Sequence, residues 1–287
     1  MPAPAITHHS ARVNGVRLHY ALAGSGKPLY LLHGYPQTWY CWRKVVPLLA
    51  PHFQLVMPDL RGYGDSDKPL DGYDKRTMAR DIRELARHLG DARFALAGHD
   101  RGARVAHRYA LDHGDTLTGV CVVDIIPTKT FFDHIDAKKA LGTWHWLFLP
   151  QVDLAERLIS ADPEAVLRHF HRAWAGTPTA IEEEAFQEYL RCFRMAGTIR
   201  ATCADYRAGA GIDLEHDAAD ADKRIEAPLL AVWAGKYRVA DNFDVLAVWR
   251  EKARQVEGKP IMDSGHFIAE ESPEALAAEL IRFFGNK

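Results

Sequence analysis

The sequence predicts an α/β protein with a mostly parallel, doubly wound sheet and a helical segment inserted into it. Short apolar runs, typical of strands covered on both faces, alternate with helical patterns up to residue 127 and again from residue 228. Between them, residues 128–215 show helical stretches and no convincing buried strand. We therefore expect a core domain formed by residues 1–127 and 216–287, and a helical cap formed by residues 128–215.

The core elements follow from local patterns. Val16 to Ala21 roughly alternates between apolar and polar residues, which is typical of a half-buried strand. Buried strands are expected at 29–32, 53–57, 94–97, 120–126 and 228–233, and a last strand is expected near 260–262. Helices are expected at 39–49, at 78–89 with Gly90 ending the helix, at 103–111, and from Ser272-Pro273 onward.

Two start signals stand inside the predicted cap. They are Asp162-Pro163 and Thr177-Pro178. Proline is tolerated in the first turn of a helix because the N–H that it lacks has no intrahelical partner there. The preceding Asp or Thr offers a side-chain oxygen as an N-cap. We expect a cap helix to begin at each.

Composition excludes several classes of protein. The chain has 287 residues, is 47% hydrophobic and carries a formal net charge of −2, which gives no support for binding to nucleic acid or to an anionic membrane. The first residues, Met1 to Ala5, lack the features of a secretion signal, and no segment approaches a membrane span of ~18 apolar residues. We expect a cytoplasmic protein without metal or cofactor. Four cysteines lie far apart, with no CxxC pair to suggest a zinc site or a disulfide framework: Cys41, Cys121, Cys192 and Cys203.

The strongest functional signal is the pentapeptide 98–102, Gly-His-Asp-Arg-Gly, which joins an apolar run to a helical pattern. A nucleophile between small residues at a strand-to-helix turn is the nucleophile elbow, in which the small residues let one side chain project into the site. Here the nucleophile is Asp100. A carboxylate can displace a leaving group from an sp³ carbon and form an ester intermediate. The alternative is an ordinary turn that contains Asp.

Hydrolysis of such an ester requires a base that activates water. His266 stands on a loop after the last predicted strand, in the chain order nucleophile, acid, base. The acid that orients it is either Asp124, at the end of the strand after the elbow helix, or Asp241 or Asp244 further along. We favour Asp124, because a carboxylate at a strand end can hold the imidazole more rigidly than one on a loop.

Two further motifs concern anion binding. The backbone N–H groups of Tyr35, in the loop 33–36, and of Arg101 could stabilise the charge that develops as water attacks the ester. The plainer reading of that loop is a Gly-Pro turn. Arg101 and Arg104 lie one helical turn apart near the predicted helix start, where they could hold a substrate carboxylate in a bidentate fork. The alternative is that both form ion pairs at the surface.

Longer stretches accompany these motifs. They are residues 33–37, 59–69, 98–104, 124–128, 144–146, 205–208, 213–217 and 264–267. On these residues the chain resembles the haloacetate (fluoroacetate) dehalogenases, in the epoxide hydrolase-like branch of the α/β-hydrolases. The first two stretches are shared with epoxide hydrolases, whereas the arginine pair and the cap stretches are more specific. This chain departs from the pattern of the haloacetate dehalogenases at Tyr35, where Phe is common, and in the stretch 235–244.

The resemblance implies an α/β-hydrolase fold and the hydrolysis of a short 2-halo carboxylate to glycolate and halide, without a cofactor. It implies Asp100 as nucleophile, His266 as base with Asp124 as its orienting acid, and Arg101 and Arg104 as carboxylate ligands. It also implies a homodimer, and small-molecule substrates as the only partners. The remaining expected roles are halide binding by His145, Trp146 and Tyr206, and a pocket lining that includes Trp174 and His33.

Two other functions remain open. An epoxide hydrolase would use the same Asp nucleophile but needs acid donors, usually paired tyrosines in the cap, and only Tyr206 stands at a suggestive position. A ligand receptor on the same fold would need no catalytic set, and the intact set of Asp100, His266 and Asp124 argues against it.

Overall fold

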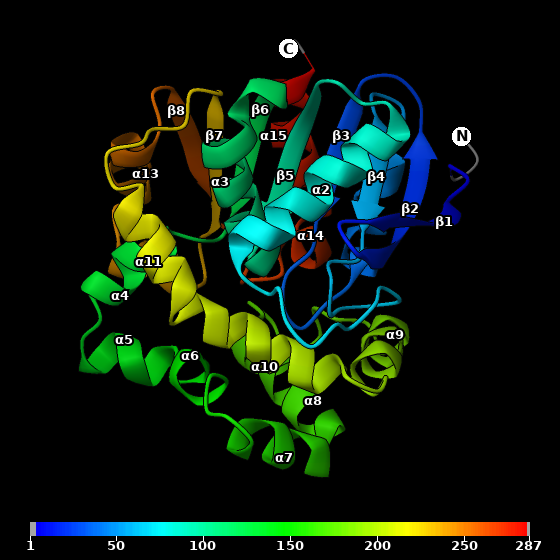
Figure 1. The fold of residues 1–287 in the computed structure, drawn as a ribbon. Helices are drawn as coiled ribbons and strands as arrows, with labels where there is room; N and C mark the ends of the chain where they lie inside the picture. Colours follow the sequence, from blue (N-terminus) through cyan, green and yellow to red (C-terminus); the bar gives the residue numbers. More distant parts are fainter. Residues whose placement is uncertain (1–3, 286–287) are drawn as a thin grey trace.

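The computed structural model describes residues 4–285. The first three residues of the chain and the last two, which belong to the predicted core domain, lie outside this range, as do three of the five residues considered for a secretion signal. Within the range, eight strands form one sheet in the order β1-β2-β4-β3-β5-β6-β7-β8 (Figure 1). The strands are β1 (Thr7–Val13), β2 (Val16–Gly24), β3 (Pro28–Leu32), β4 (Gln54–Pro58), β5 (Phe94–His99), β6 (Leu117–Val123), β7 (Leu229–Ala234) and β8 (Val256–Ile261).

Strand direction confirms the predicted mostly parallel sheet. Only β2 runs antiparallel to its neighbours, β1 and β4, and the other neighbouring strands pair in parallel. Every residue of the central strand β5 is buried, as its apolar sequence predicts. The edge strand β1 was not predicted, because five of its seven residues are exposed and it has no apolar run.

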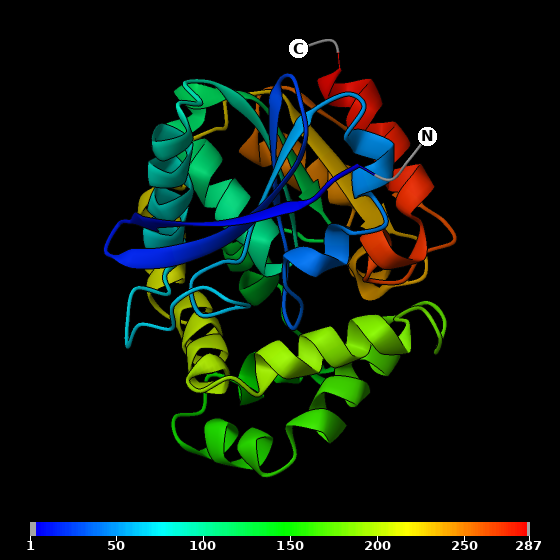
Figure 2. The same cartoon turned by 90° about the vertical axis from the view of Figure 1, so that its right-hand side faces the viewer.

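Helices cover both faces of the sheet. Figure 2 shows α2 (Lys75–Leu89) and α3 (Arg101–His113) on one face and α15 (Pro273–Phe284) on the other. Gly90 ends α2 with a left-handed φ of 83°, as expected. The last helix begins at Pro273, also as expected, although the side chain of Ser272 makes no capping hydrogen bond. Three shorter helices complete the core after β7: α12 (Arg238–Asn242), α13 (Val245–Lys252) and α14 (Ile268–Glu271).

The single helix predicted at 39–49 is wrong. The segment folds as a 3₁₀ helix, η1 (Trp39–Trp42), followed by a turn and the short α1 (Val46–Leu49). Pro47 has no N–H to donate inside a longer helix, so it stands in the first turn of a new one. The hydroxyl of Thr38 caps η1 by accepting the N–H of Tyr40.

Residues between β6 and β7 are helical, and no strand occurs among them. The helices are α4 (Thr128–Asp133), α5 (Ala137–Gly142), α6 (His145–Phe148), α7 (Leu154–Ala161), α8 (Pro163–Trp174), α9 (Glu183–Phe193), α10 (Thr198–Gly209) and α11 (Ile212–Ala219). Figures 1 and 2 show α5 to α10 gathered at one end of the sheet. We propose the same division into core and cap for the folded chain. Its second boundary moves to the end of α11, because residue 216 lies inside that helix.

The two start signals in the cap have different outcomes. As predicted, α8 begins at Pro163, and the carboxylate of Asp162 accepts the N–H of Ala165 at 2.9 Å. The helix predicted from Thr177-Pro178 is wrong, since residues 177–181 form turns and the next helix, α9, begins only at Glu183. A hydrogen bond from the N–H of Ala180 to the Thr177 carbonyl closes this turn.

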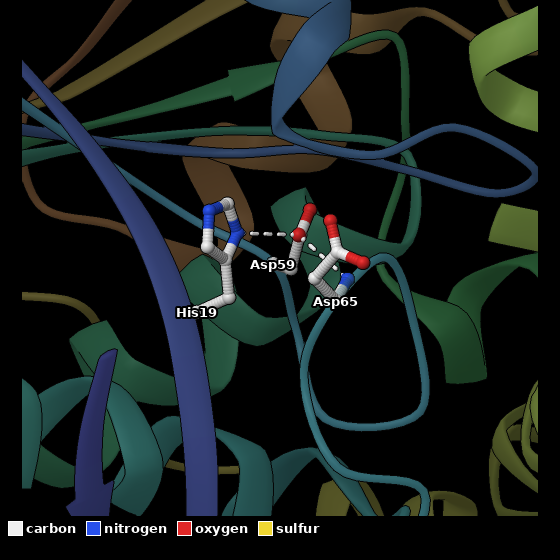
Figure 3. A group of neighbouring side chains, drawn as sticks. All are labelled: His19, Asp59 and Asp65. Carbon is white, nitrogen blue, oxygen red and sulfur yellow. Dashed lines mark hydrogen bonds and ion pairs between the residues drawn. The ribbon is translucent and has the colours of Figure 1, made fainter. Parts of the chain in front are cut away.

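A polar network anchors the segment after β4. Asp59 accepts hydrogen bonds from Nδ1 of His19 at 2.7 Å, from the N–H of Trp39 at 2.9 Å and from the N–H of Asp65 at 3.0 Å. Figure 3 shows its carboxylate between His19 and Asp65. The carboxylate of Asp65 in turn pairs with Arg191 of α9 at 2.9 Å. This network ties two strands and a cap helix together, so the stretch 59–69 supports the fold.

Within residues 4–285, no helix has the length and apolar character needed to cross a membrane.

Candidate active site

The predicted nucleophile lies on a strained turn. Asp100 joins β5 to α3 with φ 48° and ψ −115°, which is a rare conformation for a residue with a side chain. The neighbouring glycines make this turn possible. A Cβ on Gly98 would collide with the backbone of Gly102, and a Cβ on Gly102 would collide with the carbonyl oxygen of His33. The small residues of the pentapeptide therefore let β5, α3 and the loop after β3 approach one another.

The two oxygens of the Asp100 carboxylate have different surroundings. Oδ1 accepts the backbone N–H of Tyr35 at 2.9 Å, whereas Oδ2 lies 3.8 Å from Nε2 of His266, beyond hydrogen-bond distance. Burial alone would raise the pKa of Asp100, but the positive charges of His266 and of the nearby histidine and arginine side chains outweigh it and lower the pKa. Asp100 is therefore ionised at neutral pH, with Oδ2 available for attack.

His266 is held in the orientation that a base requires. Its Nδ1 lies 2.6 Å from Oδ2 of Asp124, and the other oxygen of Asp124 accepts the N–H of Ala234 at 3.0 Å. The carboxylate fixes the proton on Nδ1 and leaves Nε2 facing Asp100. Burial lowers the pKa of His266, but the hydrogen bond and charge of Asp124, together with the charge of Asp100, outweigh it and raise the pKa.

Asp124, and neither of the alternatives considered, contacts His266. It follows β6 directly with φ 56°, so the strand fixes its carboxylate. Asp244 instead caps α13 by accepting the N–H of Ala247 at 3.0 Å. Asp241 lies on α12 and is exposed.

A cavity of about 60 Å³ opens onto these groups. It holds roughly four water molecules, and therefore a ligand of few non-hydrogen atoms. The core contributes Asp100, Asp124, His266 and Arg104, and the cap contributes His145, Trp146 and Trp174. Trp174, expected to line the pocket, does so, and its ring centroid lies 4.6 Å from that of His145.

The guanidinium of Arg101 is held by the cap. Its Nε and Nη2 donate to the two carboxylate oxygens of Asp205, in α10, at 3.0 and 2.6 Å. Asp205 also pairs with Lys75 and accepts the hydroxyl of Tyr63 at 2.6 Å. Arg101 is not among the residues that line the cavity, and only its Nη1 is buried without a partner. The bidentate fork expected for the substrate is thus occupied by Asp205.

Arg104, in contrast, lines the cavity and has no acidic partner within ion-pair distance in residues 4–285. Its Nη1 donates to the carbonyl of Ile126 at 3.0 Å and to the hydroxyl of Thr128 at 2.9 Å, and its Nε is buried without a partner. Burial, followed by repulsion from Arg101, lowers the pKa of Arg104 to about 10. The site thus contains a buried cation that an anionic ligand would stabilise.

The three residues expected to bind halide lie together. The ring centroid of Tyr206 is 5.9 Å from that of His145 and 5.7 Å from that of Trp146. His145 and Trp146 line the cavity, and Tyr206 contacts both from α10. Within the described chain, Nδ1 of His145 and the hydroxyl of Tyr206 are buried without partners. Burial lowers the pKa of His145 to about 3, so it is neutral.

The loop after β3 carries His33 and Tyr35, whose side chains have different surroundings. His33 does not line the cavity, contrary to expectation: its Nδ1 donates to the Gly34 carbonyl at 3.0 Å and its Nε2 accepts the N–H of Leu60 at 3.1 Å. His33 therefore shapes the loop that presents the N–H of Tyr35. The hydroxyl of Tyr35 is buried without a partner, and its ring packs edge-on against Tyr206 with centroids 5.2 Å apart.

Sequence reasoning missed three residues of this region. Asp205 was quoted only as part of the stretch 205–208, although its place beside Tyr206 was a usable signal. Tyr237 and Arg238 also line the cavity, and they belong to the stretch 235–244 that departs from the family pattern.

A carboxylate on a strained strand-to-helix turn, a histidine after the last strand and an acid after β6 define an α/β-hydrolase site. Residues 27–273 match the protein family described as alpha/beta hydrolase fold, and the chain belongs to this family. Its relatives place it in the epoxide hydrolase-like branch, and it is a hydrolase.

Two curated relatives span nearly the whole chain. The soluble epoxide hydrolase of Corynebacterium sp. (strain C12) is 41% identical over 283 residues, which cover 97% of each chain. The fluoroacetate dehalogenase of Burkholderia sp. is 37% identical over 281 residues, which cover 96% of this chain and 92% of the relative. Among solved structures, the ligand-free epoxide hydrolase CorEH superposes with a TM-score of 0.93 at 40% identity, covering 98% of this chain and 99% of its own.

Proposed function

We propose that the protein hydrolyses haloacetates to glycolate and halide through an ester on Asp100. One observation carries the proposal: several buried hydrogen-bond donors around Asp100 have no partner in the described chain. They are Nε of Arg104 and Nδ1 of His145, in residues that line the cavity, and the hydroxyl of Tyr206, whose ring contacts that of His145. Buried polar atoms are seldom unpaired, and each costs about 1–3 kcal/mol. A small molecule with a carboxylate at one end and a halogen at the other would supply acceptors for them.

In the first step, Oδ2 of Asp100 attacks the carbon that carries the halogen. The carbon–halogen bond breaks, and its electron pair leaves with the halide towards His145, Trp146 and Tyr206. A departing halide loses its water shell in a buried cavity, so hydrogen-bond donors must replace it. Arg104 lines the same cavity and provides the positive charge that holds the substrate carboxylate during attack.

In the second step, Nε2 of His266 accepts a proton from water, and the resulting hydroxide attacks Cγ of Asp100. Negative charge develops on Oδ1, which already accepts the N–H of Tyr35. Arg101 opens α3, where backbone N–H groups lack intrahelical acceptors, so its N–H is a suitable second donor. The bond between Cγ and the glycolate oxygen then breaks, and the proton of the added hydroxide passes to that oxygen, which regenerates the carboxylate of Asp100 and releases glycolate. Asp124 stabilises the imidazolium of His266 until it returns its proton to solvent.

Epoxide hydrolysis is the second candidate, and the unpaired hydroxyl of Tyr206 favours it. Burial, together with the charge of Asp100, raises the pKa of Tyr206 well above its usual value, so the hydroxyl stays protonated and can donate to an opening epoxide oxygen. The relative from Corynebacterium is named an epoxide hydrolase. We rank this function second because a neutral epoxide would leave the buried charge of Arg104 uncompensated.

The decisive experiment uses His266→Asn, which removes the base of the second step only. Incubated with chloroacetate, this variant should release one chloride per active site and then stop, and intact mass should show a glycolyl ester that maps to the peptide containing Asp100. Asp100→Asn is the matched control and should form no ester. An epoxide panel in parallel identifies the second candidate, if only epoxides yield an ester. Continuous chloride release by His266→Asn without any adduct would overturn the ester mechanism.

A further inference from the structure

One wall of the catalytic cavity comes from a segment that the two chemical steps do not use. The stretch 235–244 includes the loop after β7 and α12, and it departs from the family pattern. Five of its residues nevertheless line the same cavity as Asp100: Tyr237, Arg238, Val239, Asn242 and Phe243. Residues that depart from the family pattern and line the catalytic cavity are candidates for determining which ligand binds there.

Arg238 is the cation in this wall. Its Nη1 donates to the carbonyl of Gly142, the last residue of cap helix α5. Its guanidinium carbon lies 5.3 Å from the ring centroid of Tyr237, and that ring is 4.7 Å from the ring of His266. These contacts fix the guanidinium between core and cap, beside the catalytic base.

The charge of Arg238 is not neutralised by the protein. Within residues 4–285, no carboxylate lies at ion-pair distance from it, whereas Arg101 has one in Asp205. Arg238 is half-buried, whereas Arg101 and Arg104 are almost fully buried. A cation that is partly exposed and unpaired at a cavity attracts anions from solution.

Arg238, to which the sequence analysis gave no role, lines the cavity, whereas Arg101 does not. The fork of Arg101 binds Asp205, and Arg101 does not line the cavity, so Arg104 lacks the arginine partner expected for it. Arg238 lines the cavity that Arg104 lines, but from α12 and not from α3.

We infer that Arg238 is a substrate-recognition residue, the outer cation that draws a small carboxylate into the cavity before Arg104 holds it. This inference rests on the proposed function in one respect, that the substrate is a carboxylate. A guanidinium already held by the Gly142 carbonyl loses little conformational freedom when it binds a second oxygen acceptor. Arg238 contributes to the capture of the substrate. It therefore acts on KM and on the salt dependence of kcat/KM more than on the rates of the chemical steps.

The test compares Arg238→Gln and Arg238→Lys with Lys236→Gln. Lys236 is a suitable control because it is exposed, pairs with Asp263 at 3.4 Å and does not line the cavity. Arg238→Gln should lower kcat/KM for chloroacetate by about tenfold or more, mainly through KM, and should flatten its dependence on ionic strength. Arg238→Lys should retain the salt dependence, and Lys236→Gln should match the parent protein. An unchanged KM and salt dependence in Arg238→Gln would overturn the inference and leave the proposed function standing.

Calorimetric titration with glycolate separates the two proposals. The parent protein should bind this carboxylate, and Arg238→Gln should bind it about tenfold or more weakly. If the parent protein binds glycolate in this Arg238-dependent way but releases no halide from haloacetates, carboxylate recognition stands and the dehalogenase proposal fails. Equal affinity in both proteins, or no binding by either, would overturn the role of Arg238.

Discussion

Asp100 and His266 each shift the pKa of the other in the direction that the proposed reaction needs. The ionised carboxylate helps to raise the pKa of His266, and the positive charge of the histidine helps to keep Asp100 ionised. Formation of the ester neutralises Asp100, which removes one cause of the raised pKa. The pKa of His266 is therefore lowered at the step of the proposed reaction in which water must be deprotonated.

Asp100→Asn reproduces this loss of charge and should lower the pKa of His266, while Asp124 remains in place. NMR titration of the His266 ring would measure the change, with the exposed Asp263→Asn as a control that leaves the pKa unchanged.

The raised pKa of His266 also has a consequence for stability. Protonated His266 stabilises the fold below its unfolded pKa of about 6.5, and this contribution is lost as pH rises through the folded pKa. In Asp100→Asn the loss should occur at lower pH, whereas an unshifted His266 titration would contradict this coupling.

The sequence was sufficient to predict that Asp100, His266 and Asp124 come together, because their signals are local. Asp100 stands between small residues at a strand-to-helix turn, Asp124 directly follows β6, and His266 lies on the loop after β8. The partner of Arg101 could not be predicted in the same way. Asp205 lies 104 positions further along the chain, and only packing of the cap onto α3 brings the two together.

Among the elements, α3 and α10 are joined most firmly by charge. The carboxylate of Asp205 compensates two buried cations, Arg101 and Lys75, at the contact between cap and core. Burial alone would raise the pKa of Asp205, but the charges and hydrogen bonds of these cations lower it, so it is ionised throughout the neutral range. Lys75 also lies 3.4 Å from a carboxylate oxygen of Asp213, whereas Arg101 has Asp205 as its one acidic partner in residues 4–285.

Asp205→Asn should therefore be strongly destabilising, because it leaves buried positive charge uncompensated. We expect the free energy of unfolding to fall by about 3–5 kcal/mol, measured by urea denaturation. Glu183→Gln is a matched control: it breaks the exposed ion pair with Arg168 in the cap and should cost under about 1 kcal/mol. Similar losses in the two variants would show that the buried pair contributes no more than a surface pair.

Helix ends could be predicted where local hydrogen bonds and backbone conformation decide them, and not where a tertiary contact does. Gly90 and Asp162 act through hydrogen bonds and backbone conformations within a few residues, and both helix ends were predicted. Thr177-Pro178 carries a similar local signal but starts no helix, because the chain there returns to the core. The N–H of Gly176 donates to Glu271 at 2.7 Å, a tertiary contact that no local pattern contains.

Across the whole molecule, the cap is fastened unevenly to the core. On the side of α9 and α10, ion pairs cross between the two, including Arg191–Asp65, Lys44–Glu182 and Arg101–Asp205. On the other side, α5 has no buried residue, and Arg238 reaches its last carbonyl from the core. Opening at low free energy is expected where buried contacts are few.

Hydrogen exchange should show this difference directly. Backbone amides of α5, residues 137–142, should exchange faster than those of α10, residues 198–209, when peptides are followed by mass spectrometry. The core helix α3, which is largely buried, serves as the slow reference. Equal protection of α5 and α10 would contradict an opening on the α5 side.

The hydrogen bond from the Tyr35 N–H to Oδ1 also determines the origin of the hydroxyl oxygen in the proposed product, glycolate. Oδ2 forms the ester, so the oxygen that leaves in glycolate was an atom of Asp100, and the oxygen of water stays behind in the carboxylate. Because Tyr35 retains Oδ1, the new atom takes the place of Oδ2 and becomes the next to leave. Each solvent oxygen thus spends one catalytic cycle as part of the polypeptide, and Oδ1 remains the same atom from one turnover to the next.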